Sequence, residues 1–292
     1  MFLLTGGTGT AGSIILREFV RQQVPIRALV RDPAKAERLA AAAPDVDVVV
    51  GDMLRAETLG PALDGVDRVL MISSPRDRMV ETQCRFIDAA KGAGVRHIVK
   101  LSGKESGTTF DQNAFRGTRW HQQIERYLEA SGVEWTQLRP SQFMQTYLPE
   151  ALTGVDVARH ALVMPIGASA LSPVDIEDVA RVSVAMMRDA DIAGQVFEMT
   201  GPEALTQSEV AELLSAATGT AFTYESVTRQ HKRAAHAATG LPDTAVDLLD
   251  ELYAGRAGSP RSRVDLSTHE RYGVAPTTFA EFARRNASAF AG

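Results

Sequence analysis

The stretch Gly6-Gly7-Thr8-Gly9-Thr10-Ala11-Gly12 decides the fold of this chain. It follows the apolar run Phe2-Leu3-Leu4 and comes directly before Ser13-Ile14-Ile15-Leu16. The first run predicts a buried strand, and the second predicts the start of a helix with one apolar face. The glycine-rich stretch is therefore expected to form the turn between a first strand and a first helix.

Each glycine of this turn meets a different physical demand. Gly6 lets the chain leave the strand sharply because it lacks a Cβ atom. Gly9 lets the backbone approach a phosphate closely, and Gly12 lets the helix pack tightly against the sheet. A helix that begins here offers free N–H groups and a partial positive charge to an anion.

The turn has the spacing G-x-x-G-x-x-G, and no Gly-Lys-Ser or Gly-Lys-Thr follows it, which excludes a P-loop. Three glycines alone also fit an ordinary turn, but their position between a strand and a helix favours a dinucleotide pyrophosphate site. The residues that we predict to contact the pyrophosphate are Gly6, Thr8, Gly9, Thr10, Ala11 and Gly12.

Strands and helices are expected to alternate beyond this turn. The expected strands are 2–4, 25–30, 46–50, 69–72, 98–101 and 135–138, and the expected helices are 34–43, 57–63, 80–91 and 118–130. Strands so rich in Val, Ile and Leu are typical of a parallel sheet that is covered on both faces. Strict alternation of strand and helix predicts right-handed crossovers and an α/β, doubly wound, mainly parallel sheet of the Rossmann type.

The second half of the chain is less regular. We expect an NADP-binding domain over 1–150 and a smaller, mostly helical substrate-side lobe over 151–292. Part of that lobe, about 172–200, is expected to return to the main domain with a helix at 176–187 and a strand at 195–199. Capping boxes that begin at Thr206 and Thr278 predict two further helices.

Composition limits the function classes. The chain has 292 residues, of which 45% are hydrophobic, so it can bury a large core. Its net charge of −5 argues against direct nucleic-acid binding, and Arg256, Arg261 and Arg263 look like part of a solvated loop. The single cysteine, Cys84, suits a reducing cytosol, and no stretch is long and apolar enough for a membrane span. We expect a cytoplasmic monomer or homodimer with no signal peptide, no membrane association and no metal site.

The end of the second strand indicates which dinucleotide binds. An NAD site usually places Asp or Glu there, about 20 residues past the glycines, to accept hydrogen bonds from the ribose. Here Arg31 follows Val30, and a guanidinium suits a 2′-phosphate. Lys35 adds a second positive charge, so the pattern favours NADP(H). Two alternatives stay open: Asp32 bonds a ribose hydroxyl, or Arg31 pairs with Asp32 or Glu37 at the surface.

The turn and several later stretches resemble the NmrA-like group of atypical short-chain dehydrogenases/reductases over nearly the full chain. These stretches are Val30-Arg31-Asp32-Pro33, Gly51-Asp52, Leu138-Arg139-Pro140, residues 172–180 and residues 276–282. The group contains NADPH-dependent quinone and triphenylmethane-dye reductases, and also catalytically silent redox sensors that bind a dinucleotide.

The resemblance implies where further residues meet the cofactor. It implies that Asp52 and Met53 lie near the adenine. It also implies contacts along the ribose and nicotinamide from Ile72, Ser73, Ser74, Leu101, Ser102 and Gly103. Finally, it implies that Pro140, Ser141 and Phe143 lie beside the nicotinamide.

The helix after the fifth strand departs from ordinary short-chain dehydrogenases, which carry Tyr-x-x-x-Lys there. The aligned positions here are His121 and Glu125, four residues apart on one helix face. This replacement resembles the quinone-reductase branch of the group. Hydride delivery to a quinone makes a phenolate-type product whose conjugate acid has a pKa of ~10, as for tyrosine, so a weaker proton donor suffices.

We therefore expect His121 to bond the substrate oxygen or the nicotinamide ribose, with Glu125 orienting His121. The alternative is that both are polar residues without a chemical role. Two functions follow from the same cofactor pocket. One is an NADPH-dependent oxidoreductase that reduces a quinone or a similar conjugated acceptor by hydride transfer. The other is a non-catalytic NADP(H)-binding redox sensor.

Overall fold

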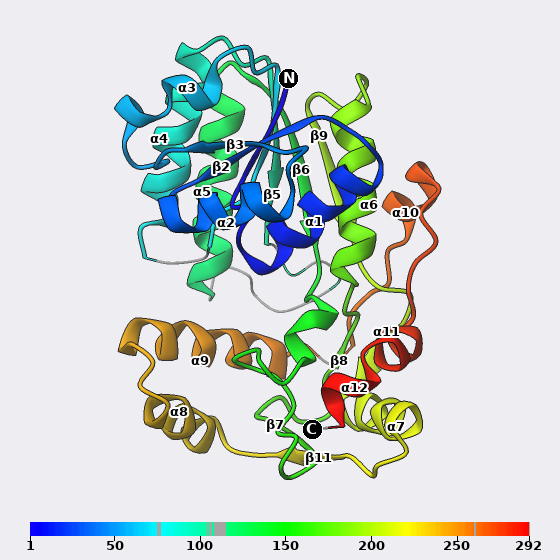
Figure 1. Cartoon of the computed structure of the whole chain (residues 1–292). Helices are drawn as coiled ribbons and strands as arrows, with labels where there is room; N and C mark the ends of the chain where they lie inside the picture. The colour runs from blue at the N-terminus through cyan, green and yellow to red at the C-terminus, as the bar shows by residue number, and fades with distance from the viewer. Residues whose placement is uncertain (75–76, 104, 106, 108–114, 260, 292) are drawn as a thin grey trace. The chain divides into compact units, whose positions relative to one another are not determined.

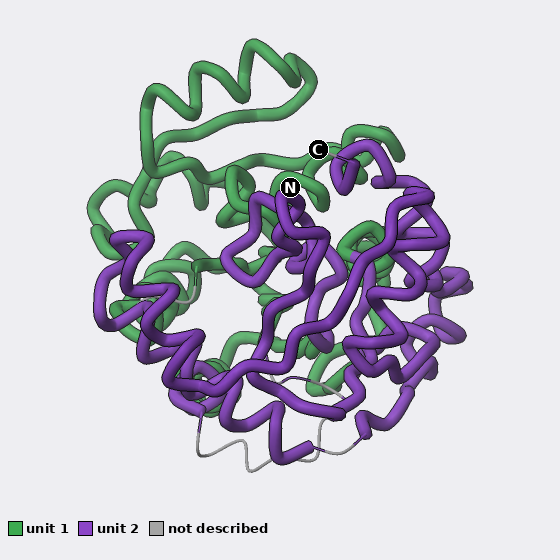
Figure 2. Tube along the Cα trace, turned by 90° about the horizontal axis from the view of Figure 1, so that it is seen from below, with its two compact units in different colours: residues 1–102, 120–139, 176–197 green, residues 103–119, 140–175, 198–292 purple. Residues whose placement is uncertain are grey.

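The computed structural model of the chain describes residues 1–292 except 75–76, 104, 106, 108–114, 260 and 292. Two compact units share the chain, and each is built from three segments (Figure 2). Unit 1 comprises residues 1–102, 120–139 and 176–197, and unit 2 comprises residues 103–119, 140–175 and 198–292.

The main sheet has the strand order β3-β2-β1-β4-β5-β6-β9 (Figure 1). Its strands are β1 (Phe2–Thr5), β2 (Ile26–Val30), β3 (Asp47–Val50), β4 (Arg68–Met71), β5 (His97–Leu101), β6 (Glu134–Pro140) and β9 (Gln195–Met199). Every pairing from β3 through to β6 is parallel. The chain adds strands outward from β1 on one side and from β4 on the other, so the predicted doubly wound, Rossmann-type sheet is confirmed.

Helices cover this sheet on both faces. The helices that contribute to unit 1 are α1 (Thr10–Arg21), α2 (Pro33–Ala42), α3 (Gly60–Leu63), α4 (Met79–Gly92), α5 (Arg116–Ala130) and α6 (Ile176–Arg188), with a 3-10 turn η1 (Ala56–Thr58). Phe86 of α4 and Ile124 of α5 pack against Val69 and Ile98 in one fully buried cluster. Helices α1 and α6 lie together over the other face (Figure 1).

Unit 2 has its own core and two small sheets. Strand β7 (Ala161–Met164) pairs in parallel with β11 (Thr223–Ser226), and β8 (Ala170–Leu171) pairs antiparallel with β10 (Leu205–Thr206). Its helices are α7 (Gln207–Thr218), α8 (Arg229–Ala238), α9 (Asp243–Ala257), α10 (Ser267–Tyr272), α11 (Phe279–Arg285) and α12 (Ala287–Phe290), with a 3-10 turn η2 (Met144–Tyr147). Tyr147, Phe279 and Phe282 stack edge to face or tilted at its centre.

Both predicted capping boxes are present. Thr206 opens α7 and Thr278 opens α11, and in each case the hydroxyl and the glutamate three residues later cap one another's backbone N–H. Within the described residues, every helix is too short or too polar to cross a lipid bilayer.

Candidate functional site

The glycine-rich turn is held at the carboxyl end of β1 by two backbone contacts. Gly6 has a φ of +67°, and a Cβ atom on it would lie 2.8 Å from the Ile72 carbonyl oxygen. A Cβ on Gly12 would lie 2.1 Å from the Gly6 carbonyl oxygen. On Gly9 the nearest atom would be 3.4 Å away, which is an ordinary contact. The protein itself therefore requires glycine at 6 and 12, whereas at Gly9 the close approach of a phosphate stays a prediction.

Helix α1 begins at Thr10 with no side-chain cap and no acidic residue in its first turn. The first N–H groups of a helix have no partner inside the helix, so they are satisfied by a cap, by water or by a bound anion. Helix α2 offers a contrast, because the Asp32 carboxylate accepts hydrogen bonds from the backbone N–H groups of Ala34 and Lys35. The uncapped start of α1 fits a pyrophosphate.

Arg31 is the first residue beyond β2, which ends at Val30. Asp32 caps α2 through Oδ1, which lies 2.9 Å from the Ala34 nitrogen, so a ribose contact from its other oxygen stays an open alternative. Arg31 and Lys35 are both exposed, and neither forms an ion pair within the part of the chain that is described. The alternative in which Arg31 pairs with Asp32 or Glu37 is not found there. Two free cations thus stand at the end of β2.

The residues expected near the adenine lie on the neighbouring strand end. The Gly51 N–H donates to the Val30 carbonyl at 3.1 Å, which brings the end of β3 beside the end of β2. The Asp52 carboxylate accepts from the Leu54 N–H at 3.0 Å, and Met53 is half-buried against the core. Their contacts with an adenine stay predictions.

The end of β4 comes next to the glycine turn. The Thr5 hydroxyl donates to the Ile72 carbonyl at 2.7 Å and accepts from the Ile72 N–H at 2.8 Å. The Ser73 hydroxyl accepts a hydrogen bond from Gln83 at 2.7 Å, while Ser74 is exposed. The predicted sugar-contacting residues of β4 therefore lie at the same sheet edge as Gly6.

A buried lysine that the sequence did not single out lies at the end of β5. Lys100 is fully buried, and its ammonium lies 2.8 Å from Nδ1 of His121 and 3.2 Å from the Ser102 hydroxyl. Burial lowers the pKa of Lys100 to about 7, against an opposing effect of the Glu125 carboxylate. Burial and the Lys100 charge lower the pKa of His121 well below its usual range. At neutral pH the imidazole is uncharged, and in the form in which Lys100 is protonated Nδ1 accepts its hydrogen bond and Nε2 carries the ring proton.

Glu125 is held by a different set of partners. Its carboxylate accepts two hydrogen bonds from the Arg139 guanidinium, at 2.9 and 2.6 Å, and one from the Ser102 hydroxyl at 2.7 Å. Burial works to raise the pKa of Glu125, but Arg139 and Ser102 outweigh it and lower the pKa below the usual value. The expectation that Glu125 orients His121 is wrong, because Lys100 bonds the imidazole and Glu125 connects to it only through Ser102 and Lys100.

The remaining predicted residues belong to unit 2. Gly103 is its first residue, and Pro140 ends β6. The Ser141 N–H donates to the Met199 carbonyl at 2.8 Å, and its hydroxyl donates to the Ser172 carbonyl. Phe143 is half-buried and pairs with Val174 in an isolated bridge. Their positions beside a nicotinamide stay predictions.

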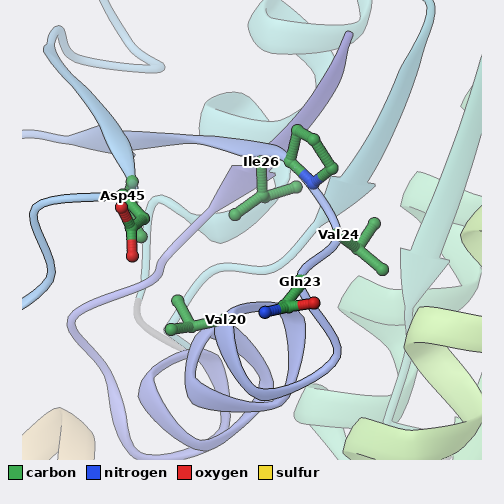
Figure 3. A pocket seen from close by; sticks show the side chains of 7 residues that line it. Val20, Gln23, Val24, Ile26 and Asp45 are labelled. Carbon is green, nitrogen blue, oxygen red and sulfur yellow. The ribbon is translucent and has the colours of Figure 1, made fainter.

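A separate hollow lies at the amino ends of the strands, where β2 begins (Figure 3). It is lined by Val20, Gln23, Val24, Pro25, Ile26, Asp45 and Val46. Ligands of open α/β sheets bind outside the carboxyl ends of the strands. The hollow is therefore separate from the site formed by Gly6, Arg31 and Lys100.

Comparison with known proteins identifies the family. The model of the NmrA-like family matches residues 1–283. The chain belongs to the NmrA-like family. An NAD(P)H azoreductase of Xenophilus azovorans is 35% identical over 290 residues, which cover 99% of each chain. Quinone oxidoreductase 2 of Escherichia coli is 29% identical over 285 residues, which cover 96% of each chain.

Solved structures agree with this membership. The structure of the NADPH-dependent quinone oxidoreductase QOR2 of Escherichia coli, complexed with NADPH, matches with a TM-score of 0.84 at 28% identity. The match covers 98% of this chain and 99% of that one. The triphenylmethane reductase of Citrobacter sp. complexed with NADP(H) has the same fold, with a TM-score of 0.84 at 21% identity over 98% and 100% of the two chains.

Replacing Gly12 by alanine should destabilise the protein, because the new Cβ would meet backbone atoms that only a shift of the turn can move. We expect a loss of about 1–3 kcal/mol in the free energy of unfolding, measured by urea denaturation without cofactor. Gly9→Ala is the matched control and should stay within about 0.5 kcal/mol of the unmodified protein. Equal losses in the two variants would contradict the distinction between these glycines.

Lys100→Met should change how stability depends on pH. Folding lowers the pKa of Lys100 from 10.5 to about 7, so between these values the unfolded chain binds more protons and stability rises with pH. From pH 7 to pH 9 the unfolding free energy of the unmodified protein should rise by about 2 kcal/mol relative to Lys100→Met. The exposed Lys91 of α4 supplies the control, and Lys91→Met should show no such difference. A constant difference between Lys100→Met and the unmodified protein would contradict the assignment.

Proposed function

We propose that this protein is an NADPH-dependent oxidoreductase that reduces a quinone or a similar conjugated acceptor by hydride transfer. One observation carries the proposal. The uncapped start of α1 and the Lys100–His121 pair lie at the carboxyl ends of β1 and β5, which form one edge of a parallel sheet. An anion site and a neutral proton donor at the same edge suit a reduction that uses a dinucleotide.

The residues present fit NADPH. The contacts around Gly6 and Gly12 require glycine at these positions, and a glycine at position 9 supports the close approach of a phosphate to the first turn of α1. Beyond β2, Arg31 and Lys35 offer two exposed cations to a 2′-phosphate, while Asp32 is occupied as a cap. When bound, NADPH supplies the hydride. The protein's own part is to bind and orient it and to provide a proton at His121 Nε2.

The acceptor is expected to be an extended conjugated molecule. Two relatives support this class of acceptor: one is named an NAD(P)H azoreductase and the other a quinone oxidoreductase. An azo compound and a quinone both take a hydride into a conjugated system. A reduced quinone is a phenolate-type anion with a conjugate-acid pKa of ~10, so it can take its proton from water or from a histidine that is itself supplied with a proton. The Tyr-x-x-x-Lys pair of ketone-reducing relatives is then dispensable.

Arg31→Ala should weaken NADPH binding far more than NADH binding, because only NADPH carries the 2′-phosphate. We expect the Kd for NADPH to rise roughly tenfold to 100-fold, as for a lost charge-assisted hydrogen-bond pair of about 1.5–3 kcal/mol. Titration calorimetry with both nucleotides measures this. Arg17→Ala, an exposed arginine of α1, is the control and should leave both constants unchanged. An equal loss for both nucleotides would count against the NADP(H) assignment.

The purified protein should oxidise NADPH when 2-methyl-1,4-naphthoquinone or an azobenzene dye is supplied, measured under argon as the loss of NADPH absorbance. His121→Ala should lower kcat roughly 100-fold, the usual contribution of a positioned proton donor. Gln123→Ala, an exposed neighbour on α5, is the matched control and should retain full activity. Micromolar NADPH binding with no turnover of any acceptor would overturn the reductase and favour the redox sensor.

A further inference from the structure

We infer that Lys100 is the positioning residue for the reductive step: it donates to His121 Nδ1 and passes a proton through the imidazole to the reduced acceptor. This inference rests on the proposed reductase function and adds the source of the proton. The geometry comes from two elements, since Lys100 lies on β5 and His121 lies on α5. His121 occupies the position of the tyrosine in Tyr-x-x-x-Lys, and a lysine contacts it here too. This lysine lies on strand β5, whereas the lysine of Tyr-x-x-x-Lys lies on the same helix as the tyrosine.

The contacts settle which nitrogen faces the acceptor. Lys100 Nζ lies 2.8 Å from Nδ1, and an ammonium has only donors to offer. When Lys100 is protonated, Nδ1 is the acceptor, and the proton of the neutral ring is on Nε2. Among the described residues Nε2 has no hydrogen-bond partner, and His121 is half-buried, so this N–H is free for a substrate oxygen or nitrogen.

The charges around Lys100 favour an anionic product. Among the residues that the structure describes, three charged or titratable groups face it: His121 and Glu125 on α5, and Arg139 on β6. With Glu125 ionised and Arg139 and Lys100 both protonated, the cluster carries one net positive charge. Until Lys100 gives up its proton, this positive charge in a buried setting stabilises the negative charge that develops on a reduced acceptor. Burial also places the pKa of Lys100 at about 7, so the group both holds and releases a proton near neutrality.

The reduction transfers one hydride and one proton to the acceptor, and both have a source. NADPH, when bound, would supply a hydride to the acceptor, and the anionic product would then need one proton from the protein. The Nε2–H bond breaks and its proton goes to that anion, while Nδ1 takes a proton from Lys100 Nζ. The imidazole ends neutral with its proton on Nδ1, and Lys100 ends as an amine. One proton from water restores the pair, so each turnover consumes one NADPH and one solvent proton.

The test measures kcat at saturating NADPH and acceptor from pH 5.5 to pH 9. In the unmodified protein kcat should fall as pH rises through about 7, because the Lys100 donor loses its proton. Lys100→Met should lower kcat roughly 100-fold, remove this falling limb and leave KM unchanged. Lys91→Met is the control and should behave as the unmodified protein does.

Two further measurements separate proton transfer from a structural role. Lys100→Gln still offers an N–H to Nδ1 but has no proton to release, so it should be as slow as Lys100→Met. The loss should also be larger for the azobenzene dye than for the naphthoquinone, because a nitrogen anion is more basic than a phenolate. Circular dichroism and NADPH affinity check that each variant is folded.

Three results would overturn the inference while leaving the reductase function intact. They are a falling limb that persists in Lys100→Met, normal turnover in that variant, and full activity in Lys100→Gln. If the unmodified protein itself reduces neither acceptor, the proposed function fails and the inference fails with it. The outcomes of the two proposals are thus distinguishable in a single set of assays.

Discussion

The contact between Gly12 and the Gly6 carbonyl is the constraint on which the site depends. Because no Cβ intervenes at Gly12, the first turn of α1 presses against the backbone that leaves β1. Gly6 also lies against Ile72 at the end of β4, so the glycine-rich turn is fixed between strands β1 and β4. This places the uncapped start of α1 at the point where the strand order reverses, which is where open α/β sheets bind their ligands.

Most of unit 1 could be predicted from the sequence because its signals are local. Runs of Val, Ile and Leu mark the parallel strands, and β9 was expected at the residues where it lies. Both capping boxes were expected for the same reason, since the whole motif spans four residues. Unit 2 was harder. The strands β7 and β8 are too short for periodicity to reveal, and α8 has no apolar residue larger than alanine.

Arg256 shows why charge alone misleads. The stretch with Arg256, Arg261 and Arg263 was expected to form a solvated loop, yet Arg256 lies at the end of α9 and is buried. Its guanidinium donates two hydrogen bonds to Glu105, which is 151 residues earlier in the chain. A buried arginine needs such a partner, and no local pattern identifies a carboxylate at that distance in sequence.

The same limit explains the missed part of the site. His121 and Glu125 were found because four-residue spacing is visible in a sequence, and that spacing suggested that they contact each other. The actual partners, Lys100 and Arg139, come from β5 and β6; Lys100 was expected only as a strand residue, and Arg139 only as part of a family motif. The available signal was a lysine inside an otherwise apolar strand, because a charge buried there must be paired or must lose its proton. Lys100 is hydrogen-bonded to His121, and burial also lowers its pKa to about 7, so it loses its proton near neutrality. A sheet that buries such a lysine gives up stability, which is the usual sign that the residue is retained for chemistry.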